Sequence, residues 1–444
     1  MRARVAPLTL LVSAVLVPAL LMSGCSASSP APEVADGPAL LRVPADHPTI
    51  TDAVEAADEG DTVLVAPGMY RETVAIATAG ITLRGEARDE VVIDGEVRRG
   101  NGVVVSAPGV TVQNLTVRNA TQNGLLVTGM RSDDGTPVGG HDGYRTIDTD
   151  DFPLLDGFRV DHVTASNNGL YGIYAFNAAN GVITDSYASG GADSGIYVGQ
   201  CDRCNIVVSG NVAERNAVGF EIANAGGGLI VTGNRFVGNR IGATIASDYQ
   251  EAYVPQRAAT LVGNVIAANA EVATPEQAEG GFGIGVGIAG GAENEVTANL
   301  VEANPAAGVV VTSAEDLGPE ANRITGNALR GNGLDLVYSP SARAPGAENC
   351  WEGNAGAVSA PSDLQTLSPC SAPAAVDAVA FAPVAGPAGI PFSEVAAPPA
   401  QPDLGSVDAP LQRWKGAEDV PQIDVAGIGI PSPDLLAENS AVRW

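Results

Sequence analysis

The residues best suited to chemistry in this sequence lie on short strands that begin with glycine and in one long acidic insertion. The strands place Tyr174, Tyr197 and Glu221 at equivalent positions, 23 and 24 residues apart. The insertion, residues 128–158, holds four further candidates: His141, Asp142, Tyr144 and Arg145. A carboxyl group beside a second acid or a histidine can transfer protons in glycoside cleavage or epimerisation. Glu221, with Asp142 or His141, is therefore the catalytic candidate.

The tyrosines indicate a surface that binds sugar. Sugar rings present apolar C–H faces, which pack well on aromatic rings. We expect the binding residues to be Tyr174, Tyr197, Tyr144, Arg145 and Thr244. Two alternatives stay open: stacked tyrosines can simply stabilise neighbouring strands, and an isolated acid on a solvated strand is commonly inert. Because few basic residues accompany this surface (Arg131, Arg145 and Arg257), a neutral glycan is favoured over a uronate.

The same residue types argue against a resident metal. The acidic insertion could bind Ca²⁺ through oxygen ligands, but Asp148-Thr149-Asp150-Asp151 lacks the glycine and distal glutamate of an EF-type loop. The chain has three histidines and four methionines, too few for a histidine-rich site or for copper handling. His162 follows Asp161 in a turn and is expected to be structural. We therefore predict no metal and no cofactor, with Ca²⁺ as the open alternative.

The glycine-led strands belong to a repeat that predicts the fold. Gly172, Gly195, Gly219 and Gly242 each open a short apolar strand, at steps of 23, 24 and 23 residues. Asparagine pairs five residues apart form a second track: Asn211/Asn216, Asn234/Asn239, Asn264/Asn269, Asn299/Asn304, Asn327/Asn332 and Asn114/Asn119. Short strands with no helical period predict an all-β parallel solenoid, with coils about 4.8 Å apart. The asparagines are expected at turns, each bonding its counterpart in the next coil.

Alternation divides each strand into a core face and an outer face. The inward set is Ile173, Ala175, Ile196, Val198, Phe220, Ile222 and Ile245, and the outward set is Leu126, Tyr174, Tyr197, Glu221, Thr244 and Val310. Three insertions, residues 128–158, 247–259 and 312–320, leave from the same end of this column of strands. Loops on one side of a rigid scaffold commonly build a site. We expect a groove with tyrosines on its floor and acids at its margins.

The four cysteines after Cys25 predict disulfides, because their number is even and an exported chain folds in an oxidising compartment. The simplest pairing joins Cys201 to Cys204 and Cys350 to Cys370. The Cys201-Asp202-Arg203-Cys204 run could instead be a redox pair or half of a metal site. A redox pair would need a strand-to-helix context, and a metal site would need two more ligands nearby.

The first 24 residues resemble an export signal. Arg2 and Arg4 precede an apolar run that is too short and too rich in proline for a comfortable membrane span. Residues 21–25, Leu-Met-Ser-Gly-Cys, resemble a bacterial lipobox with methionine where leucine is usual. The resemblance implies cleavage before Cys25, lipidation of Cys25, and a lipid-anchored protein on the outer face of the bacterial cytoplasmic membrane or cell envelope. Secretion with a free Cys25 is the alternative.

The chain is therefore divided into four parts: a signal peptide (1–24), a tether (25–38), the β-helix (39–358) and a Pro/Ala-rich C-terminal extension (359–444). Residues 49–60 predict a helix, because Ile50, Ala53, Val54 and Ala57 share one apolar face that could cover the N-terminal end of the coils. The extension could be a disordered spacer or could lie along the coils. Trp414 and Trp444 favour docking, since a solvated tail has little use for tryptophan.

Charge and composition exclude one class of function. The 444 residues include 51 acids and 23 bases, a net charge of −28. Sequence-independent binding of nucleic acid needs clustered Lys and Arg, so no nucleic-acid partner is expected. Aromatic residues make up 5% and there are 54 glycines, which favours short strands and tight turns over helices.

Residues 43–50, 60–70 and 81–85 resemble the opening of bacterial right-handed parallel β-helix proteins of the pectin-lyase-like superfamily. The coils resemble the repeats of its carbohydrate-binding and sugar-hydrolase branch, which includes periplasmic accessory proteins of metalloenzyme maturation. The resemblance covers about residues 43–340 and implies the fold. The Asp-Pro-His run of alginate epimerases and the signatures of polygalacturonases and pectin methylesterases are absent, so it implies no particular reaction.

Two functions follow as expectations. The first is a cell-envelope lipoprotein whose β-helix groove binds a polysaccharide or glycan, and processes it if the acids are catalytic, as a lyase, hydrolase or epimerase. The second is a non-catalytic maturation or scaffold factor on the envelope surface. The partners expected are a glycan and, through the lipid anchor, the membrane, with oligomeric state left open.

Overall fold

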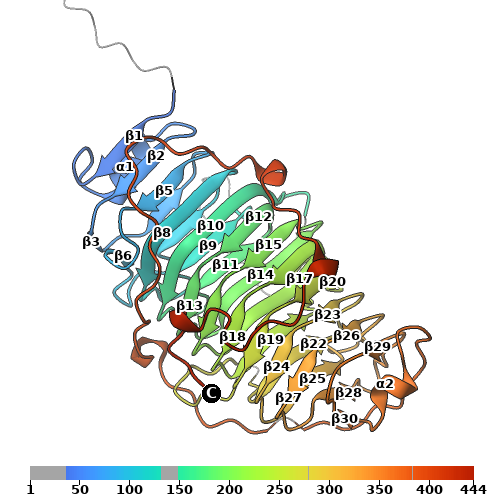
Figure 1. Ribbon diagram of the computed structural model, residues 1–444. Coiled ribbons are helices and arrows are strands. Elements are labelled where there is room, and N and C mark those ends of the chain that lie inside the picture. The colour runs from blue at the N-terminus through green and yellow to red at the C-terminus, as the bar shows by residue number, and fades with distance from the viewer. Residues whose placement is uncertain (1–36, 132–148, 279, 383) are drawn as a thin grey trace, which may run out of the picture. The chain divides into compact units, whose positions relative to one another are not determined.

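The computed structural model describes residues 37–131, 149–278, 280–382 and 384–444. From Pro38 onward these residues form one compact unit. In the described part of the chain, thirty strands make one continuous sheet, and each strand pairs in parallel with the equivalent strands of the coils before and after it (Figure 1). This arrangement agrees with the predicted all-β solenoid.

The coils have three faces, which we call faces A, B and C. Face A contains β4 (Val74–Ile76), β7 (Val103–Val105), β9 (Leu125–Thr128), β11 (Ile173–Phe176), β14 (Ser194–Asp202), the start of β17 (Val218–Thr232), β19 (Ile241–Ala246), β22 (Ile284–Ala289), β25 (Ala307–Thr312), β28 (Leu336–Ser339) and β30 (Ser359–Ala360). Every glycine-led strand of the repeat lies on this face.

Face B follows face A in each coil. It contains β1 (Leu40–Val43), β2 (Thr62–Val65), β5 (Thr82–Gly85), the starts of β8 (Val110–Arg118) and β10 (Leu155–Ser166), β12 (Ala178–Thr184), β15 (Ile206–Ser209), the end of β17, β20 (Arg257–Val262), β23 (Glu295–Thr297), β26 (Arg323–Thr325) and β29 (Cys350–Glu352).

Face C closes the coil. It contains β3 (Gly68–Tyr70), β6 (Val91–Asp94), the ends of β8 and β10, β13 (Tyr187–Ser189), β16 (Val212–Glu214), β18 (Arg235–Val237), β21 (Val265–Ala267), β24 (Leu300–Glu302) and β27 (Ala328–Arg330). The core lies between the three faces, and the predicted inward residues, from Ile173 to Ile245, are all buried in it.

Two ladders of asparagine explain the second track of the repeat. At the turn from face B to face C, a ladder runs from Asn211 through Asn234, Asn264, Asn299 and Asn327 to Asn354. At the turn from face C to face A, a second runs from Asn216 through Asn239, Asn269 and Asn304 to Asn332. Each side-chain Nδ2 donates to the next Oδ1 at 2.8–3.1 Å. The predicted bonding between coils is confirmed.

The ladder also explains why the strands of the repeat on face A start with glycine. A Cβ atom on Gly219 would lie 2.6 Å from the carbonyl oxygen of Gly242 and 2.7 Å from Nδ2 of Asn239. Both distances are shorter than van der Waals contact, so a side chain would push the ladder apart. The two sequence tracks are therefore one device, in which the asparagine fills the space that glycine leaves.

The Asn114/Asn119 pair was wrongly assigned to the ladders. Both residues have positive φ, 56°, and lie one position before the ladder site, where later coils carry glycines such as Gly210 and Gly238. Asn114 Nδ2 donates to the carbonyl of Gly85, and Asn119 Nδ2 donates to Asp94. Asparagine tolerates the left-handed backbone conformation, so here it replaces glycine and does not bond a neighbouring amide.

Helices are few and short in the described residues. Helix α1 spans Ile50–Ala56, and Thr49 Oγ1 accepts from the backbone N–H of Asp52 at its N-terminus. Its apolar face buries Ile50, Ala53 and Val54. Helix α2 spans Leu364–Leu367, and single 3₁₀ turns lie at Phe392–Glu394, Gly416–Glu418, Val425–Gly427 and Ala437–Asn439. Within this part of the chain no helix has the length and apolarity to cross a bilayer.

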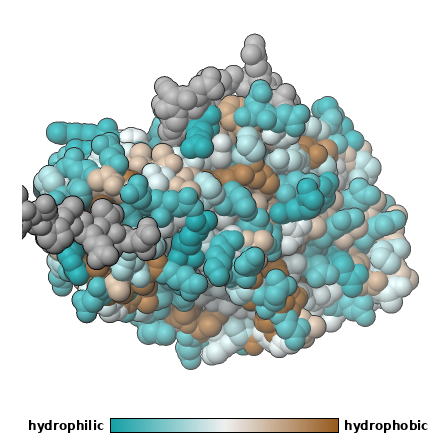
Figure 2. Space-filling view, turned by 90° about the horizontal axis from the view of Figure 1, so that it is seen from above, coloured by the Kyte–Doolittle hydropathy of each residue, from teal (hydrophilic) through white to brown (hydrophobic). Residues whose placement is uncertain are grey.

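Both predicted disulfides are present, Cys201–Cys204 between the end of β14 and the turn that follows it, and Cys350–Cys370 between β29 and the segment that follows α2. The second disulfide marks where the chain leaves the coils. Beyond it the extension runs back across the coils as an irregular, extended segment, drawn in orange and red in Figure 1. Its described residues form no β-strand after Ala360. The surface seen in Figure 2 is mainly hydrophilic, with apolar residues in small separate patches.

The extension is held by contacts with coils far from it in sequence. Asn167 Nδ2 donates to the carbonyl groups of Phe392 and Val395, and the backbone N–H of Leu404 donates to Asn114. The indole of Trp414 is 7% exposed and donates to the carbonyl of Asn180.

Candidate functional site

The outer side of face A carries one continuous row of side chains across the coils. In the order of the register it reads Leu126, Tyr174, Tyr197, Glu221, Thr244, Gly287 and Val310. Alternation along the strands puts this row opposite the core, so the predicted outward set is confirmed. At its C-terminal end Val310 is buried in a cluster that Phe381 of the extension covers.

Four aromatic rings form a cluster in the first half of this row. Tyr171, which precedes β11, stacks on Tyr174 with ring centroids 4.3 Å apart. Tyr174 also stacks on Phe176 at 5.2 Å and meets the edge of Tyr197 at 4.8 Å. Tyr171 and Tyr174 are half-buried, whereas Tyr197 is only 2% exposed. A ring this covered presents no face to a ligand, so Tyr171 and Tyr174 are the residues that can stack on a sugar.

Tyr197 instead reaches the second insertion. Its hydroxyl donates to Oε1 of Glu251 in a short hydrogen bond. Glu251 is 5% exposed, and its Oε2 has no hydrogen-bond partner among the described residues. The sequence predicts acids at the margins of the groove, but Glu251 of the insertion 247–259 is buried, so for this residue the prediction was wrong. The residue lies in a tight loop that turns its side chain inward over the strands. The alternation of inward and outward side chains holds for strands and does not predict side-chain direction in such a loop.

The environment of Glu251 favours the protonated form of its carboxyl group. Burial raises the pKa of Glu251 to about 8, with a smaller contribution from Asp248, against the hydrogen bond from Tyr197, which lowers it. Burial together with the nearby carboxyl groups of Glu251 and Glu221 likewise raises the pKa of Tyr174 well above its ordinary value. Near neutral pH the site therefore contains a protonated carboxyl hydrogen-bonded to a neutral phenol.

Three amides at the end of the face A strands fix the two insertions in place. Asn177 Nδ2 donates to the carbonyl groups of Phe152 and Pro153 in the first insertion. Gln200 Oε1 accepts from the backbone N–H of Ala252, and Asn224 exchanges two hydrogen bonds with Asp248. All three amides have positive φ, 44–58°. The polar turn residues thus hold Glu251 over the strand row, although the sequence pattern did not single them out.

The row continues from Glu221 to Thr244 and Gly287. Thr244 is half-buried, and its Oγ1 is buried with no partner among the described residues. Next to it, a Cβ atom added to Gly287 would meet nothing within 4 Å. Glu221, between Tyr197 and Thr244, is half-buried. The site therefore combines stacked tyrosines, two carboxyl groups and an open glycine position on one face.

Four of the predicted site residues, His141, Asp142, Tyr144 and Arg145, lie outside the described residues. The structure brings together Tyr174, Tyr197, Glu221 and Thr244, as expected from their spacing. Sequence reasoning missed Tyr171 as a stacking residue and Glu251 as a buried acid. A signal for Tyr171 was present, because it lies three residues before Tyr174, just ahead of the strand.

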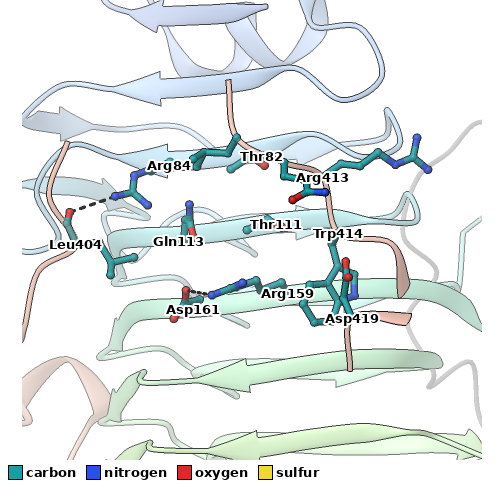
Figure 3. Close-up of a pocket in the computed structure, with 12 residues that line it drawn as sticks. Thr82, Arg84, Thr111, Gln113, Arg159, Asp161, Leu404, Arg413, Trp414 and Asp419 are labelled. Atoms are coloured by element: carbon teal, nitrogen blue, oxygen red, sulfur yellow. Dashed lines mark hydrogen bonds and ion pairs between the residues drawn. The ribbon is translucent and has the colours of Figure 1, made fainter. Parts of the chain in front are cut away.

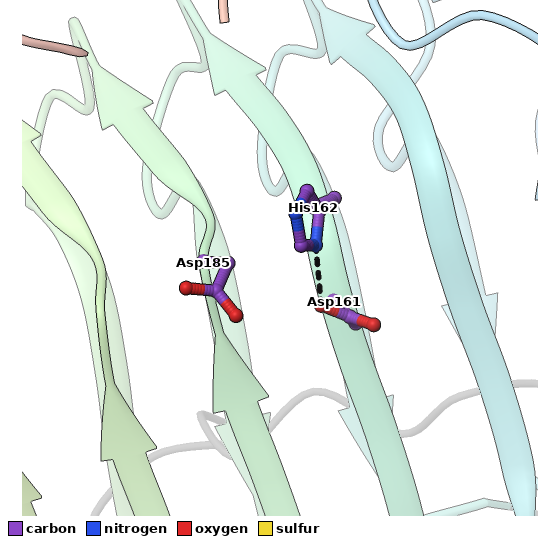
Figure 4. Close-up of side chains that lie close together, drawn as sticks. All are labelled: Asp161, His162 and Asp185. Carbon is purple, nitrogen blue, oxygen red and sulfur yellow. Dashed lines mark hydrogen bonds and ion pairs between the residues drawn. The ribbon is translucent and has the colours of Figure 1, made fainter. Parts of the chain in front are cut away.

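A second cluster of titratable residues lies at the turn from face B to face C, where Asp161, His162 and Asp185 could each offer a ligand atom to a metal (Figure 4). Asp161 already accepts from His162 Nδ1 at 2.6 Å and pairs with Arg159 at 2.6 Å. Although burial alone would raise it, these two partners hold the pKa of Asp161 below its ordinary value. Both carboxylate oxygens are thus paired, which supports a structural role for His162.

Comparison with known proteins finds one matching family profile and several distantly similar structures. A profile of the family described as a right handed beta helix region matches residues 99–266. Among curated protein sequences, none matches. Similar solved structures include the A-module of the mannuronan C-5 epimerase AlgE4 of Azotobacter vinelandii, with 17% identity, 68% of this chain and 90% of that chain covered, and a TM-score of 0.38. An alginate lyase of Paenibacillus sp. is 16% identical over 71% of this chain and 97% of that chain, with a TM-score of 0.35.

Proposed function

We propose that this protein binds a glycan on the outer side of face A, along the row from Tyr174 to Gly287. The observation that carries the proposal is the stack of two half-buried rings, Tyr171 and Tyr174, beside an open and polar part of the same row. Flat rings pack on the C–H face of a sugar, while Glu221 and Thr244 offer hydrogen-bonding groups to its hydroxyls. The rigid coils fix these groups at the inter-strand spacing.

The same surface has the groups for proton transfer. A carboxyl with a pKa near 8 carries its proton at neutral pH, as a general acid in glycosidic-bond cleavage must. Glu251 is such a group, and Glu221 on the neighbouring strand is the candidate for the second carboxyl. We therefore extend the proposal from binding to the processing of a polysaccharide, with Glu251 in the place that the sequence alone assigned to Asp142 or His141. Mannuronan and alginate are named for two similar structures, and nothing beyond the fold is transferred from them.

A glycan array tests the binding proposal. Tyr174→Ala should weaken binding by about 1–2 kcal/mol, because it removes one flat apolar contact. Gly287→Phe should abolish binding without loss of stability, since the added ring enters open space. The matched control is Thr260→Phe, which places the same ring on the outer side of face B. Profiles that do not differ between wild type and Gly287→Phe, or no binding at all, would favour the envelope scaffold or maturation role.

Turnover then separates binding from catalysis. Glu221→Gln and Glu251→Gln keep the shape of the side chain but cannot transfer a proton. In a catalyst each should lower turnover about 100-fold or more while leaving affinity nearly unchanged. In a binding protein no turnover is detected in any variant, and the proposal reduces to its first half.

We also propose that the protein works at the bacterial cell surface, anchored by lipid on Cys25. The support is the sequence of residues 21–25 alone, which lies outside the described residues. Cys25→Ser should move the protein from the membrane fraction to the medium, and a mature N-terminus without acyl mass would refute the anchor.

A further inference from the structure

One feature that the glycan surface does not explain is a cavity on the outer side of face B. It has a volume of about 570 Å³ and lies between strands β5, β8 and β10 and the part of the extension from Leu404 to Asp419 (Figure 3). Its floor consists of polar side chains from these strands, and the extension crosses on both sides of it. A cavity of this size holds a ligand of one or two sugar rings.

The floor of the cavity has hydrogen-bonding groups that the protein leaves unused. Thr82, Thr111 and Gln113 are 1%, 5% and 5% exposed, and their side chains form no hydrogen bond within the described residues. Buried Nε atoms of Arg84 and Arg159 also have no partner there. The hydroxyl and amide groups of Thr82, Thr111 and Gln113 line the cavity, so they are placed to bond a ligand that has several oxygen atoms.

The charge of the cavity is unusual for this acidic chain. The guanidinium of Arg84, 6% exposed, donates through Nη2 to the carbonyl groups of Leu404 and Gly405 and pairs with no carboxylate among the described residues. Burial lowers the pKa of Arg84, because desolvation outweighs the attraction of Asp161 and Asp403. Arg159, by contrast, is paired with Asp161. A buried guanidinium that donates only to backbone carbonyl groups favours an anionic group on the ligand.

One wall of the cavity is aromatic. The indole of Trp414 lies on the extension, fixed by its bond to Asn180 and with Arg159 5.9 Å from the ring centroid. Hydroxyl groups, an amide, a guanidinium and an aromatic wall together match a ring that has hydroxyls, a carboxylate and an apolar face.

We propose that this cavity is a second ligand site, separate from face A, that binds a polyhydroxylated carboxylate of one or two rings, such as a sugar acid. Arg84 binds its carboxylate, Thr82, Thr111 and Gln113 bind its hydroxyls, and Trp414 packs on its apolar face. Because the coils and the extension both contribute residues, the bound ligand also fastens the extension to face B.

Calorimetric titration of the full-length protein tests this site with D-glucuronate and D-glucose as matched probes, and with inorganic phosphate as a third. The acid should bind about tenfold more tightly than the neutral sugar, since it adds a hydrogen bond to a charged group. Thr111→Val should weaken the binding of glucuronate about three- to tenfold, and Gln113→Leu should weaken it by a similar factor. Thr260→Val is the control, because it makes the same change on face B outside the cavity. Arg84→Gln should reduce the acid to the affinity of the neutral sugar.

A second measurement, the rate of trypsin cleavage in the extension, tests whether a variant loses ligand binding only because its extension has loosened. The acid should slow cleavage by trypsin after Lys415 in wild type and not in Thr111→Val. Tyr174→Ala and Gly287→Phe should leave both measurements unchanged, which separates this site from face A. Equal affinity for glucose and glucuronate, equal affinity for phosphate, or no binding of any probe would each overturn the proposal.

Discussion

The turns on two sides of the coils are stabilised by different hydrogen bonds. At the turn from face B to face C, side-chain amides bond one another from coil to coil, and the turns stay short. At the turn from face A to face B in the early coils, Asn177 and Asn224 mainly bond the backbone of long insertions. We call these the ladder side and the insertion side.

The difference shows what each kind of turn permits. On the ladder side every Oδ1 and Nδ2 is used by a neighbouring coil, so one extra residue would break bonds both above and below it. In the early coils of the insertion side the amide bonds the backbone of the loop that passes over it, so loop length can vary there. In the later coils of that side Asn294, Asn322 and Asn349 bond one another. The candidate site lies on the insertion side. The extension contacts face A at Phe381, and later residues of the extension contact faces B and C.

The largest effect is expected from breaking the ladder. Asn234→Leu removes the acceptor for Asn211 N and Nδ2, and leaves the carbonyl of Val208 without its donor. Several buried polar groups then lose their partners, which should cost about 3 kcal/mol or more. The measurement is the free energy of unfolding in urea. Gln250→Leu, an exposed amide of the second insertion, is the control and should cost little. Similar losses in both variants would contradict the contrast between the two sides.

The ladder could be predicted from the sequence because its cause is local and periodic. The 23-residue step gives the length of one coil, and the paired Gly and Asn mark its turns. The faces of the coil and the outward row of side chains could therefore be predicted. The same reasoning was wrong for Asn114 and Asn119. The sequence alone does not distinguish an asparagine that bonds the next coil from one that adopts a positive φ.

A smaller effect is expected where the extension is anchored on face C. The buried carboxylate of Glu214 accepts from Tyr187 Oη at 2.8 Å, from the backbone N–H of Ala441 at 3.0 Å, and from Ser440 Oγ. Glu214→Ala should cost about 2 kcal/mol and should release the last residues, because their N–H groups lose a charged acceptor. Faster trypsin cleavage at Arg443 and Lys415 is the measure. Exposed Glu438→Gln should not change the rate, and an unchanged rate in Glu214→Ala would remove Glu214 as the anchor.

The path of the extension could not be predicted, because it depends on single contacts between residues more than 200 positions apart, such as Ser440 with Glu214. Composition indicated docking through the tryptophans and nothing about where. The candidate site shows the same limit. Spacing predicted its strands, while the inward turn of Glu251 depends on how one irregular loop packs on Tyr197.

A third effect is expected on the insertion side and, unlike the first two, depends on pH. In the folded protein the pKa of Glu251 is about 8, above its ordinary value of 4.5. Between these values the unfolded chain releases a proton that the folded chain keeps, so the free energy of unfolding falls as the pH rises from about 4.5 to about 8. Glu251→Gln should remove this slope. The measure is urea unfolding of both proteins at pH 5 and pH 8, and a constant difference between them would show that Glu251 does not titrate there.

The extension has a consequence for how the coils unfold. In a stack of repeats each unit contacts its neighbours only, so an end can fray without disturbing the middle. Here Leu411 bonds Thr62 in one of the first coils, and Arg235 in a middle coil bonds the carbonyl groups of Pro433 and Leu435. Opening the first coils therefore frees a strand that the middle coils also hold. This links the ends of a linear array into one cooperative unit that cannot be shortened from either end without loss elsewhere.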